Sequence, residues 1–292
     1  MRLFIIGNPR SGTSLFRLLL TSHSLIHIPP ECGFMIWWLD KYRDWTTADI
    51  ATRLDVFLDD FFMSRKIEFW KLDRSRLMAD ILNAAPKSYT DLCDAIYAHH
   101  AKGAGKLDLS YLGDKNNFHV SHIDALSNLY PDALFIHIVR DGRDVATSYM
   151  SMEKIETQSQ YRPNLPSDIE KIALDWKTNL DRVRSSFSVL SDHKTFEIRY
   201  EDLVGDTKNS LSRLCRFLGL EYEPGMLSFY EENQSNALEP EEFMSWKHRT
   251  FSAVDTQAIG KYKNLAESDI QRFEAIAGDI LKAYDYQLET GA

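Results

Sequence analysis

The residues with the clearest chemical potential form a short loop near the start of the chain. Gly7 and Gly12 enclose the run Asn8-Pro9-Arg10-Ser11, and two hydroxyl residues, Thr13 and Ser14, follow directly. A glycine-bounded loop between a strand and a helix is typical of a phosphate site, because backbone N–H groups converge on the anion and the helix dipole adds partial positive charge. The pattern therefore predicts an anion cradle, and an ordinary turn with helix-capping hydroxyl groups is the alternative.

The spacing of this loop resembles the nucleotide-triphosphate P-loop, G-x-x-x-x-G-K-[ST], but the lysine is missing. Thr13 stands in the place of the lysine, and the cation is Arg10, inside the loop. In a nucleotide-triphosphate site the lysine contacts the phosphates and the next hydroxyl binds Mg²⁺. The substitution favours a different phosphate ester. A small-molecule kinase that uses ATP and Mg²⁺ is the alternative, with Asp108 or Asp114 as the metal carboxylate, although neither ends a strand that the pattern predicts.

A second group of charged residues follows an apolar run at 133–139. Arg140 comes directly after this run, and Ser148 lies eight residues later, two turns along a predicted helix. Ligands of open α/β sheets bind at the carboxyl ends of the strands, so both side chains are expected to reach one phosphate. The alternative is that Arg140-Asp141 and Arg143-Asp144 are surface ion pairs.

The elements that must position these residues alternate between strands and helices. Strands are predicted at 3–6, 133–139 and 195–200, and helices at 13–22, 123–130, 141–149, 207–218 and 268–284. This alternation predicts one α/β domain over residues 1–292, with a central, mostly parallel sheet flanked by helices, as in P-loop NTPases. Residues 31–110 are aromatic-rich and helical in pattern, which predicts a helical insertion. Residues 151–167 are polar, with two prolines, and are interpreted as a mobile connection.

Composition excludes several classes of protein. The 292 residues carry 34 Lys+Arg against 43 Asp+Glu, a net charge of −9, which argues against broad binding to nucleic acid or to anionic membranes. Three cysteines without a C-x-x-C pair suggest neither a disulfide framework nor a zinc site. No apolar run is long enough to span a membrane, and the first one is too short for a signal peptide. We therefore expect a soluble, cytoplasmic protein.

Together the two motifs resemble those of the sulfotransferases that use 3′-phosphoadenosine 5′-phosphosulfate (PAPS). The run 9–14 is similar to the family's 5′-phosphosulfate loop, and 138–148 is similar to its 3′-phosphate element. Weaker matches are Tyr200-Glu201-Asp202-Leu203, Gly260-Lys261-Tyr262-Lys263-Asn264, and Lys115, which corresponds to a lysine of the tyrosylprotein-type members. The resemblance implies transfer of a sulfonyl group from PAPS to an acceptor by in-line displacement, with release of 3′,5′-ADP and without a metal.

The resemblance also implies which residues hold the donor. They are Arg10, Ser11, Gly12, Thr13, Ser14, Arg140, Ser148, Tyr200 and Lys261. The chain departs from the cytosolic members near its C-terminus, where their R-K-G is replaced by Asp255-Thr256-Gln257. Lys247, Arg249 or Lys261 could supply the missing positive charge at the 3′-phosphate.

The general base is the third assignment that the resemblance implies. Cytosolic members carry K-x-H, whereas this chain has Lys115-Asn116-Asn117 and lacks that histidine. Tyrosylprotein and several bacterial members use a Glu shortly after the first helix, and Glu31 corresponds to it. We therefore assign Glu31 as the base that deprotonates the acceptor, and Arg10 and Lys115 as cations that stabilise the transferring group. The alternative bases are His23, His119 and His122.

The acceptor is expected to lie against the insertion that follows Glu31. Two explanations remain open for its aromatic residues, acceptor-pocket walls or core packing; they are Phe34, Trp37, Trp38, Tyr42 and Trp45, together with Met35. Acids outnumber bases over 31–62: Glu31, Asp40, Asp44, Asp49, Asp55, Asp59 and Asp60 against Lys41, Arg43 and Arg53. This balance predicts a small neutral or cationic acceptor with a hydroxyl or amine, and not a polyanion. The partners expected are this small acceptor and a second copy of the chain in a homodimer. A catalytically silent nucleotide-binding or scaffold protein is the last alternative, and the retention of Arg10, Lys115, Arg140, Ser148 and a candidate base argues against it.

Overall fold

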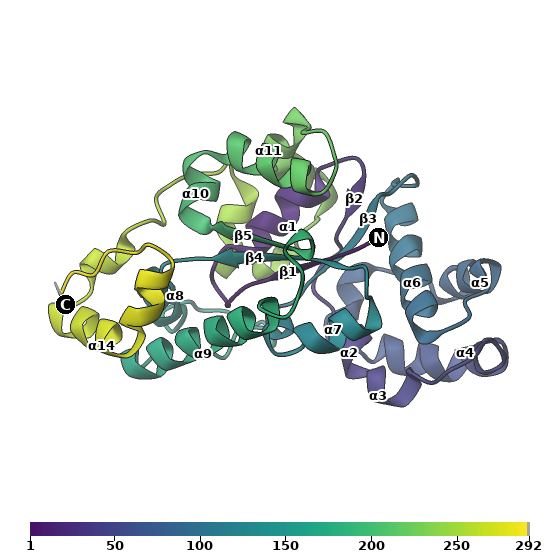
Figure 1. Ribbon diagram of the computed structural model, residues 1–292. Coiled ribbons are helices and arrows are strands. Elements are labelled where there is room, and N and C mark those ends of the chain that lie inside the picture. The colour runs from purple at the N-terminus through teal and green to yellow at the C-terminus, as the bar shows by residue number, and fades with distance from the viewer. Residues whose placement is uncertain (291–292) are drawn as a thin grey trace.

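Five parallel strands form the central sheet, in the order β2-β3-β1-β4-β5 (Figure 1). The computed structural model describes residues 1–290. The strands are β1 (Arg2–Ile6), β2 (Ile26–His27), β3 (Tyr111–Lys115), β4 (Leu134–Val139) and β5 (Thr195–Arg199). After β1 the chain adds β2 and β3 on one side of this strand, and it then adds β4 and β5 on the other side. The carboxyl end of β1 is therefore the switch point at which open α/β sheets bind ligands.

Helices connect and cover the strands. The α-helices are α1 (Thr13–Thr21), α2 (Phe34–Trp37), α3 (Leu39–Tyr42), α4 (Thr47–Phe62), α5 (Arg74–Ala84), α6 (Tyr89–Gly103), α7 (Ile123–Leu129), α8 (Gly142–Met152), α9 (Ile169–Phe187), α10 (Tyr200–Gly205), α11 (Thr207–Phe217), α12 (Phe229–Asn236), α13 (Met244–Lys247) and α14 (Glu267–Ala283). The 3₁₀ helices are η1 (Ile67–Trp70), η2 (Asn117–Ser121), η3 (Asp192–Lys194), η4 (Pro224–Ser228), η5 (Glu241–Phe243), η6 (His248–Phe251) and η7 (Lys261–Asn264).

The sheet is buried on both faces. In β1, Leu3 and Ile5 pack into a core with α1 and α11, whereas Phe4 and Ile6 pack into a second core with the helices of the insertion. Figure 1 shows α1, α10 and α11 over one face of the sheet and α7, α9 and α14 over the other. An all-apolar strand is what a parallel sheet covered on both faces requires, since successive side chains point to opposite faces.

The predicted α/β class, the three predicted strands and the predicted helices are confirmed within one or two residues at most ends. Two strands, β2 and β3, were not predicted. The short β2 has only two residues, and β3 mixes Gly113, Asp114 and Lys115 with apolar residues, so neither has a clear apolar run. Asp114, considered as a metal carboxylate, is the next-to-last residue of β3, which ends at Lys115.

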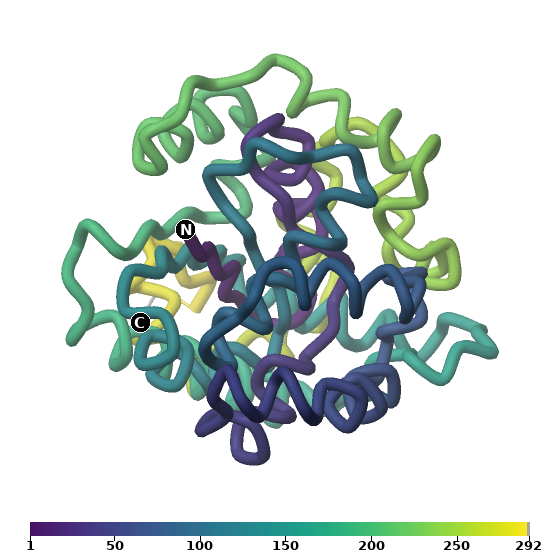
Figure 2. Tube along the Cα trace, turned by 90° about the vertical axis from the view of Figure 1, so that its right-hand side faces the viewer, coloured from purple at the N-terminus to yellow at the C-terminus, as the bar shows by residue number. Residues whose placement is uncertain are grey.

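The segment 31–110 contains α2 to α6 and η1, as the pattern predicted. Figure 2 shows these helices, in dark blue, on the side of the molecule that faces the viewer. Residues 153–168 form a connection without helix or strand, visible as a teal loop that extends beside the insertion. Its mobility stays a prediction. Among residues 1–290, no helix is both long enough and apolar enough to cross a membrane.

Candidate functional site

A cavity of about 540 Å³ opens at the carboxyl edge of the sheet. The ends of β1, β3, β4 and β5 lead directly to its lining residues, which is where a parallel sheet of this topology binds ligands. The predicted residues that line it are Arg10, Gly12, Thr13, Ser14, Glu31, Arg140, Ser148, Tyr200 and Lys261. The sequence thus placed nine residues, from six separate segments, around one cavity.

The loop after β1 has an unusual backbone. Gly12 has a φ of 90°, in the left-handed region, and a Cβ there would lie 2.5 Å from the ring of Tyr200. Arg10 also has a positive φ, 66°, which is uncommon for a residue with a side chain. Strained conformations of this kind concentrate at ligand sites. The ring of Tyr200 therefore fits only against a glycine at position 12.

The N-terminus of α1 presents free amides to the cavity. The first hydrogen bond that closes this helix runs from the N–H of Phe16 to the carbonyl of Gly12 (2.9 Å). The amides of Thr13 and Ser14 precede it and so lack helical acceptors. The N–H of Ser11, in contrast, donates to the carbonyl of Asn8 (3.2 Å), and its Oγ is buried without a partner. The loop thus presents the amides of Thr13 and Ser14 to the cavity, whereas Ser11 is buried behind its lining.

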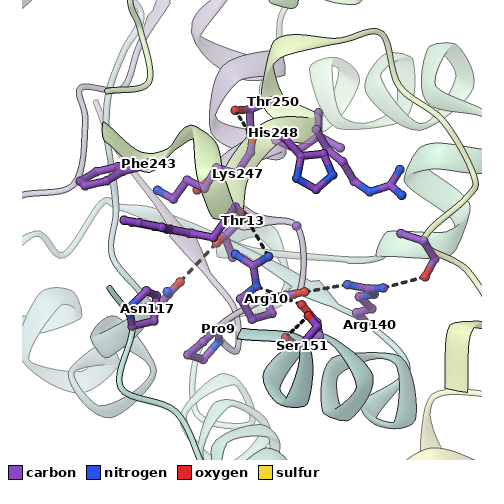
Figure 3. Close-up of a pocket in the computed structure, with 18 of the residues that line it drawn as sticks. Pro9, Arg10, Thr13, Asn117, Arg140, Ser151, Phe243, Lys247, His248 and Thr250 are labelled. Atoms are coloured by element: carbon purple, nitrogen blue, oxygen red, sulfur yellow. Dashed lines mark hydrogen bonds between the residues drawn. The ribbon is translucent and has the colours of Figure 1, made fainter. Parts of the chain in front are cut away.

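Arg10, Arg140 and Ser148 form one cluster, shown in part in Figure 3. The Nε of Arg10 donates to Ser148 Oγ (3.0 Å), and its Nη2 donates to the carbonyl of Trp246 (2.8 Å). Arg140 donates from Nη1 to the carbonyl of Arg10 (2.9 Å) and from Nη2 to the carbonyl of Ala258 (2.6 Å), while its Nε is buried without a partner. Arg10 therefore contacts the residue expected at the 3′-phosphate, and its assignment to the sulfonyl oxygens stays a prediction.

Burial of these two arginines side by side has an electrostatic consequence. Desolvation, and next the positive charge of Arg140, lower the pKa of Arg10 to about 10. An anion between the two guanidinium groups would relieve this repulsion and replace the lost water. The two guanidinium groups are therefore more stable with an anion between them than without one.

Glu31 lies between two lysines. Its Oε1 pairs with Lys115, and its Oε2 accepts a hydrogen bond from the Nζ of Lys66 at 2.5 Å. Lys115 also donates to the Oγ of Ser14 (3.2 Å), so this ammonium bridges the carboxylate and the N-terminal turn of α1. Burial alone would raise the pKa of Glu31, but Lys115, Lys66 and Lys247 outweigh it and hold this pKa well below its usual range. Burial lowers the pKa of Lys115 to about 8, although Glu31 opposes the shift.

A second buried ion pair adjoins the first, and sequence reasoning missed it. Glu239 accepts hydrogen bonds from Arg17 of α1 (2.8 Å) and from Lys247 of α13. Burial opposes ionisation of this carboxyl, but Lys247, Arg17 and Lys115 lower its pKa to about 2. Lys247 is therefore tied to Glu239, near the lysines of Glu31. Neither Glu239 nor Lys66 belongs to a motif, so only the three-dimensional arrangement reveals them.

The alternative bases and metal ligands lie outside the cavity lining. His23 and His122 bond to the carbonyls of Glu221 and Phe118, and His119 is fully buried 3.7 Å from Asp114. Asn117, in the place of the K-x-H histidine, lines the cavity and accepts a hydrogen bond from Thr13 Oγ1 (3.2 Å), but an amide is not a base. Within residues 1–290, no cluster of three His, Cys, Asp or Glu side chains is arranged to hold a metal ion.

The aromatic residues and the acids that follow Glu31 in the insertion lie away from the cavity. The aromatic stretch after Glu31 does not line the cavity: Phe34, Met35, Tyr42 and Trp45 are buried in the core, and Trp37 stacks on Phe118. Of the acids in 31–62, only Glu31 reaches the cavity. Asp40, Asp44, Asp55 and Asp59 are exposed, whereas Asp60 pairs with Lys41 and accepts a hydrogen bond from the hydroxyl of Tyr42 (2.5 Å). The aromatic walls come instead from Tyr161, Phe243 and Trp246.

The remaining C-terminal cations occupy the edge of the cavity. Lys261 is exposed there, at the start of η7, which Asp144 holds against α8 by accepting from the amides of Gly260 (2.8 Å) and Tyr262 (2.9 Å). Arg249 lines the cavity and pairs with Asp255. The structure brings both cations to the same side as Arg140, and their contact with a phosphate stays a prediction.

Comparisons with known proteins agree with this geometry. Residues 2–224 match the family model described as Sulfotransferase family. Protein-tyrosine sulfotransferase 1 of Danio rerio is 23% identical over 288 residues, which cover 97% of this chain and 72% of that protein. Protein-tyrosine sulfotransferase 2 of Gallus gallus is 24% identical over 229 residues, 78% of this chain and 54% of that protein. The chain thus spans about half the length of the second relative.

Solved structures share the fold. The sulfotransferase domain of the Synechococcus PCC 7002 olefin synthase superposes with a TM-score of 0.60 at 22% identity, covering 95% of this chain and 94% of that one. Mouse sulfotransferase SULT7A1, in complex with PAP, gives a TM-score of 0.52 at 14% identity and covers 97% of this chain and 88% of that one. The chain thus has the P-loop-like α/β fold of these proteins. The chain belongs to the sulfotransferase family, and its general activity is sulfonyl transfer.

Proposed function

We propose that the protein transfers a sulfonyl group from PAPS to a hydroxyl or amine of a small acceptor. The observation that carries this proposal is the convergence of three groups on one cavity: the loop before α1, the Arg10–Arg140–Ser148 cluster and the Glu31–Lys115 pair. Sulfotransferase relatives along most of the chain support the reaction, and a fold neighbour described as a complex with PAP supports the donor.

The lining of the cavity fits an anionic nucleotide. In the described part of the chain it includes eight Lys and Arg side chains and only two carboxylates, Glu31 and Asp144. Arg140 Nε and Ser11 Oγ are buried without partners, and such groups are costly unless a ligand satisfies them. We infer that the amides of Gly12 to Ser14 would hold the 5′-phosphate, and that Arg140 and Ser148 would hold the 3′-phosphate. Tyr200 and Lys261 would complete the site. When bound, PAPS supplies the sulfonyl group and 3′,5′-ADP as the leaving group.

The proton of the acceptor would go to Glu31. A general base must be deprotonated before the reaction, and Glu31 is ionised. The neighbouring lysines lower its pKa, however, so that it is a weak base. The ammonium of Lys115 touches both Glu31 and Ser14, so a short movement transfers its charge from the carboxylate to an anion at the loop. We infer that Lys115 makes this movement toward the sulfonyl oxygens, where it stabilises the developing charge. Its departure leaves Oε1 free and more basic.

Charge also restricts the acceptor. Arg65, Lys66 and Arg162 also line the cavity, so we propose a neutral or anionic acceptor in place of the neutral or cationic one that the acids of 31–62 predicted. We also propose that the protein works in a reducing compartment such as the cytoplasm, since all three cysteines are free and buried.

Calorimetric titration with 3′,5′-ADP, without metal, tests the donor site. We expect micromolar binding to the wild type, and binding roughly 10- to 100-fold weaker for Arg140→Ala, because each hydrogen bond to a charged group contributes about 1.5–3 kcal/mol. Arg199→Ala is the control. Arg199 is the last residue of β5 but does not line the cavity, so this variant should bind 3′,5′-ADP as the wild type does. Binding of ATP with Mg²⁺ in place of 3′,5′-ADP would overturn the proposal in favour of a kinase.

A further inference from the structure

The segment that carries Glu31 is held by η1, a short helix of the insertion. At one end of η1 the indole Nε1 of Trp70 donates to the carbonyl of Pro30 (2.9 Å), in the buried interior. At the other end the ammonium of Lys66 reaches Glu31 Oε2 at 2.5 Å. One 3₁₀ turn thus fixes both the backbone that precedes the base and the carboxylate itself.

The backbone of Lys66 has an uncommon conformation. Lys66 precedes η1 with a φ of 73°, in the left-handed region that residues with side chains rarely adopt. Its ammonium lies 5.5 Å from the centre of the Phe243 ring, and its side chain is only 20% exposed. A strained residue with a nearly buried, paired charge is unusual for a surface turn. Strain of this kind points to a contact that the site requires.

The two lysines at Glu31 differ in what else they touch. Lys115 has a second partner in Ser14, at the turn expected to hold the donor, whereas Lys66 comes from the insertion and makes no contact with that turn. If Lys115 moves toward the donor, Lys66 is the cation that stays hydrogen-bonded to Glu31. A buried carboxylate without any cation would take up a proton from water and could not accept one from the acceptor.

We propose that Lys66 is the positioning residue of the general base: it anchors Oε2 and keeps Glu31 ionised while Lys115 acts on the transferring group, so that Oε1 faces the acceptor. This inference rests on the proposed function. It also gives the helical insertion a role in the chemistry, because Lys66 and Trp70, at the two ends of η1, bond to Glu31 and to the carbonyl of Pro30.

Other charged groups around Glu31 do not replace Lys66. From β3 comes Lys115, whose charge the proposal assigns to the donor. Lys247, from α13, is paired with Glu239. His119, from η2, is fully buried and its pKa is lowered, chiefly by that burial, so it adds no positive charge at neutral pH. Lys66 is therefore the cation that remains for Oε2.

The test compares Lys66→Asn with Lys71→Asn. Lys71 follows the same helix, also at a positive φ (51°), and is exposed, so it is a matched control for charge and backbone. Asn adopts the left-handed conformation readily, which protects the fold; Lys66→Gly is a second variant with the same property. The ¹³C chemical shifts of the glutamate carboxyl groups are measured as a function of pH, with and without PAPS, and give the midpoint of each titration. The Glu31 signal is assigned by its loss in Glu31→Gln.

With PAPS bound, we expect the Glu31 midpoint to rise by one pH unit or more in both Lys66 variants, a tenfold change in proton affinity. Lys66→Arg should restore the wild-type midpoint, and Lys71→Asn should not change it. An unchanged midpoint in the Lys66 variants, in the free and the PAPS-bound protein, would overturn the inference. If PAPS does not bind to the wild type, the proposed function fails, and a raised midpoint in the free Lys66 variants still supports the anchoring of Glu31.

Discussion

Glu31 shows how the surroundings of a single carboxylate set what it can do. Burial favours its neutral form, and three lysines favour its charged form more strongly, so the resting group is ionised but weakly basic. A base of this kind becomes effective only when one of its cations is engaged elsewhere. The contact between Lys115 and Ser14 provides that possibility, because the donor is expected at the same turn.

At the residue scale we predict that Glu31→Gln separates binding from turnover. The amide keeps the shape of the side chain but cannot accept the proton, so the turnover number should fall about 10²- to 10⁴-fold. Affinity for 3′,5′-ADP should be retained or increased, since a negative charge next to Lys115 is removed. The measurement is transfer of labelled sulfonate from PAPS to an acceptor found by screening the wild type. Glu170→Gln, at an exposed position on α9 outside the cavity, is the control, and a normal rate in Glu31→Gln would exclude Glu31 as the base.

Among the elements, the strand ends determine where the chemistry is placed. Loops after β1, β3, β4 and β5 all enter one cavity because parallel strands present their carboxyl ends at one edge. Within this frame the contact between Gly12 and Tyr200 joins two elements that are 188 positions apart in the sequence. The ring of Tyr200 lies against the loop before α1 on one side and under the guanidinium of Arg140, 4.8 Å from its centre, on the other.

Gly12→Ala should therefore disrupt the donor site. The new methyl group would lie 2.5 Å from the Tyr200 ring, so the loop or the ring must shift, and we expect 3′,5′-ADP binding to become at least tenfold weaker. Gly219→Ala is a matched control, because Gly219 also has a positive φ, 68°, but no atom within 4 Å of an added Cβ. It should lose about 1 kcal/mol of stability and bind normally. Calorimetric titration and thermal unfolding of both variants check this, and equal binding by the two would contradict it.

The sequence predicted the elements with regular apolar patterns and the site residues that belong to motifs. It could not predict β3, where a glycine and two charged residues interrupt the pattern that identifies a buried strand. Nor could it predict Lys66 or Glu239, because each is a single charged residue in a short, irregular segment. Their partners, Glu31 and Arg17, are distant in the sequence, and only the fold brings them within hydrogen-bond distance.

For the molecule as a whole, charge is distributed unevenly. The chain has a net charge of −9, yet its described cavity lining contains eight basic side chains and two acidic ones. The acids therefore lie mainly outside the cavity, and the charge of the cavity lining favours an anion. The Arg17–Glu239–Lys247 network stands beneath this cavity and joins α1 to α13.

This network predicts how stability depends on pH. The pKa of Glu239 falls from 4.5 to about 2 on folding, so its ionisation stabilises the folded state above pH 4.5, and this contribution is lost as the pH falls toward 2. Glu239→Gln should lower stability at pH 7 by about 3–5 kcal/mol, because Arg17 and Lys247 stay buried without their partner. Urea unfolding at several pH values should show the difference from wild type shrinking below pH 4.5. Glu241→Gln, at an exposed position nearby, should show almost no difference at any pH, and a constant difference for Glu239→Gln would mean that its carboxyl is not ionised in the folded protein.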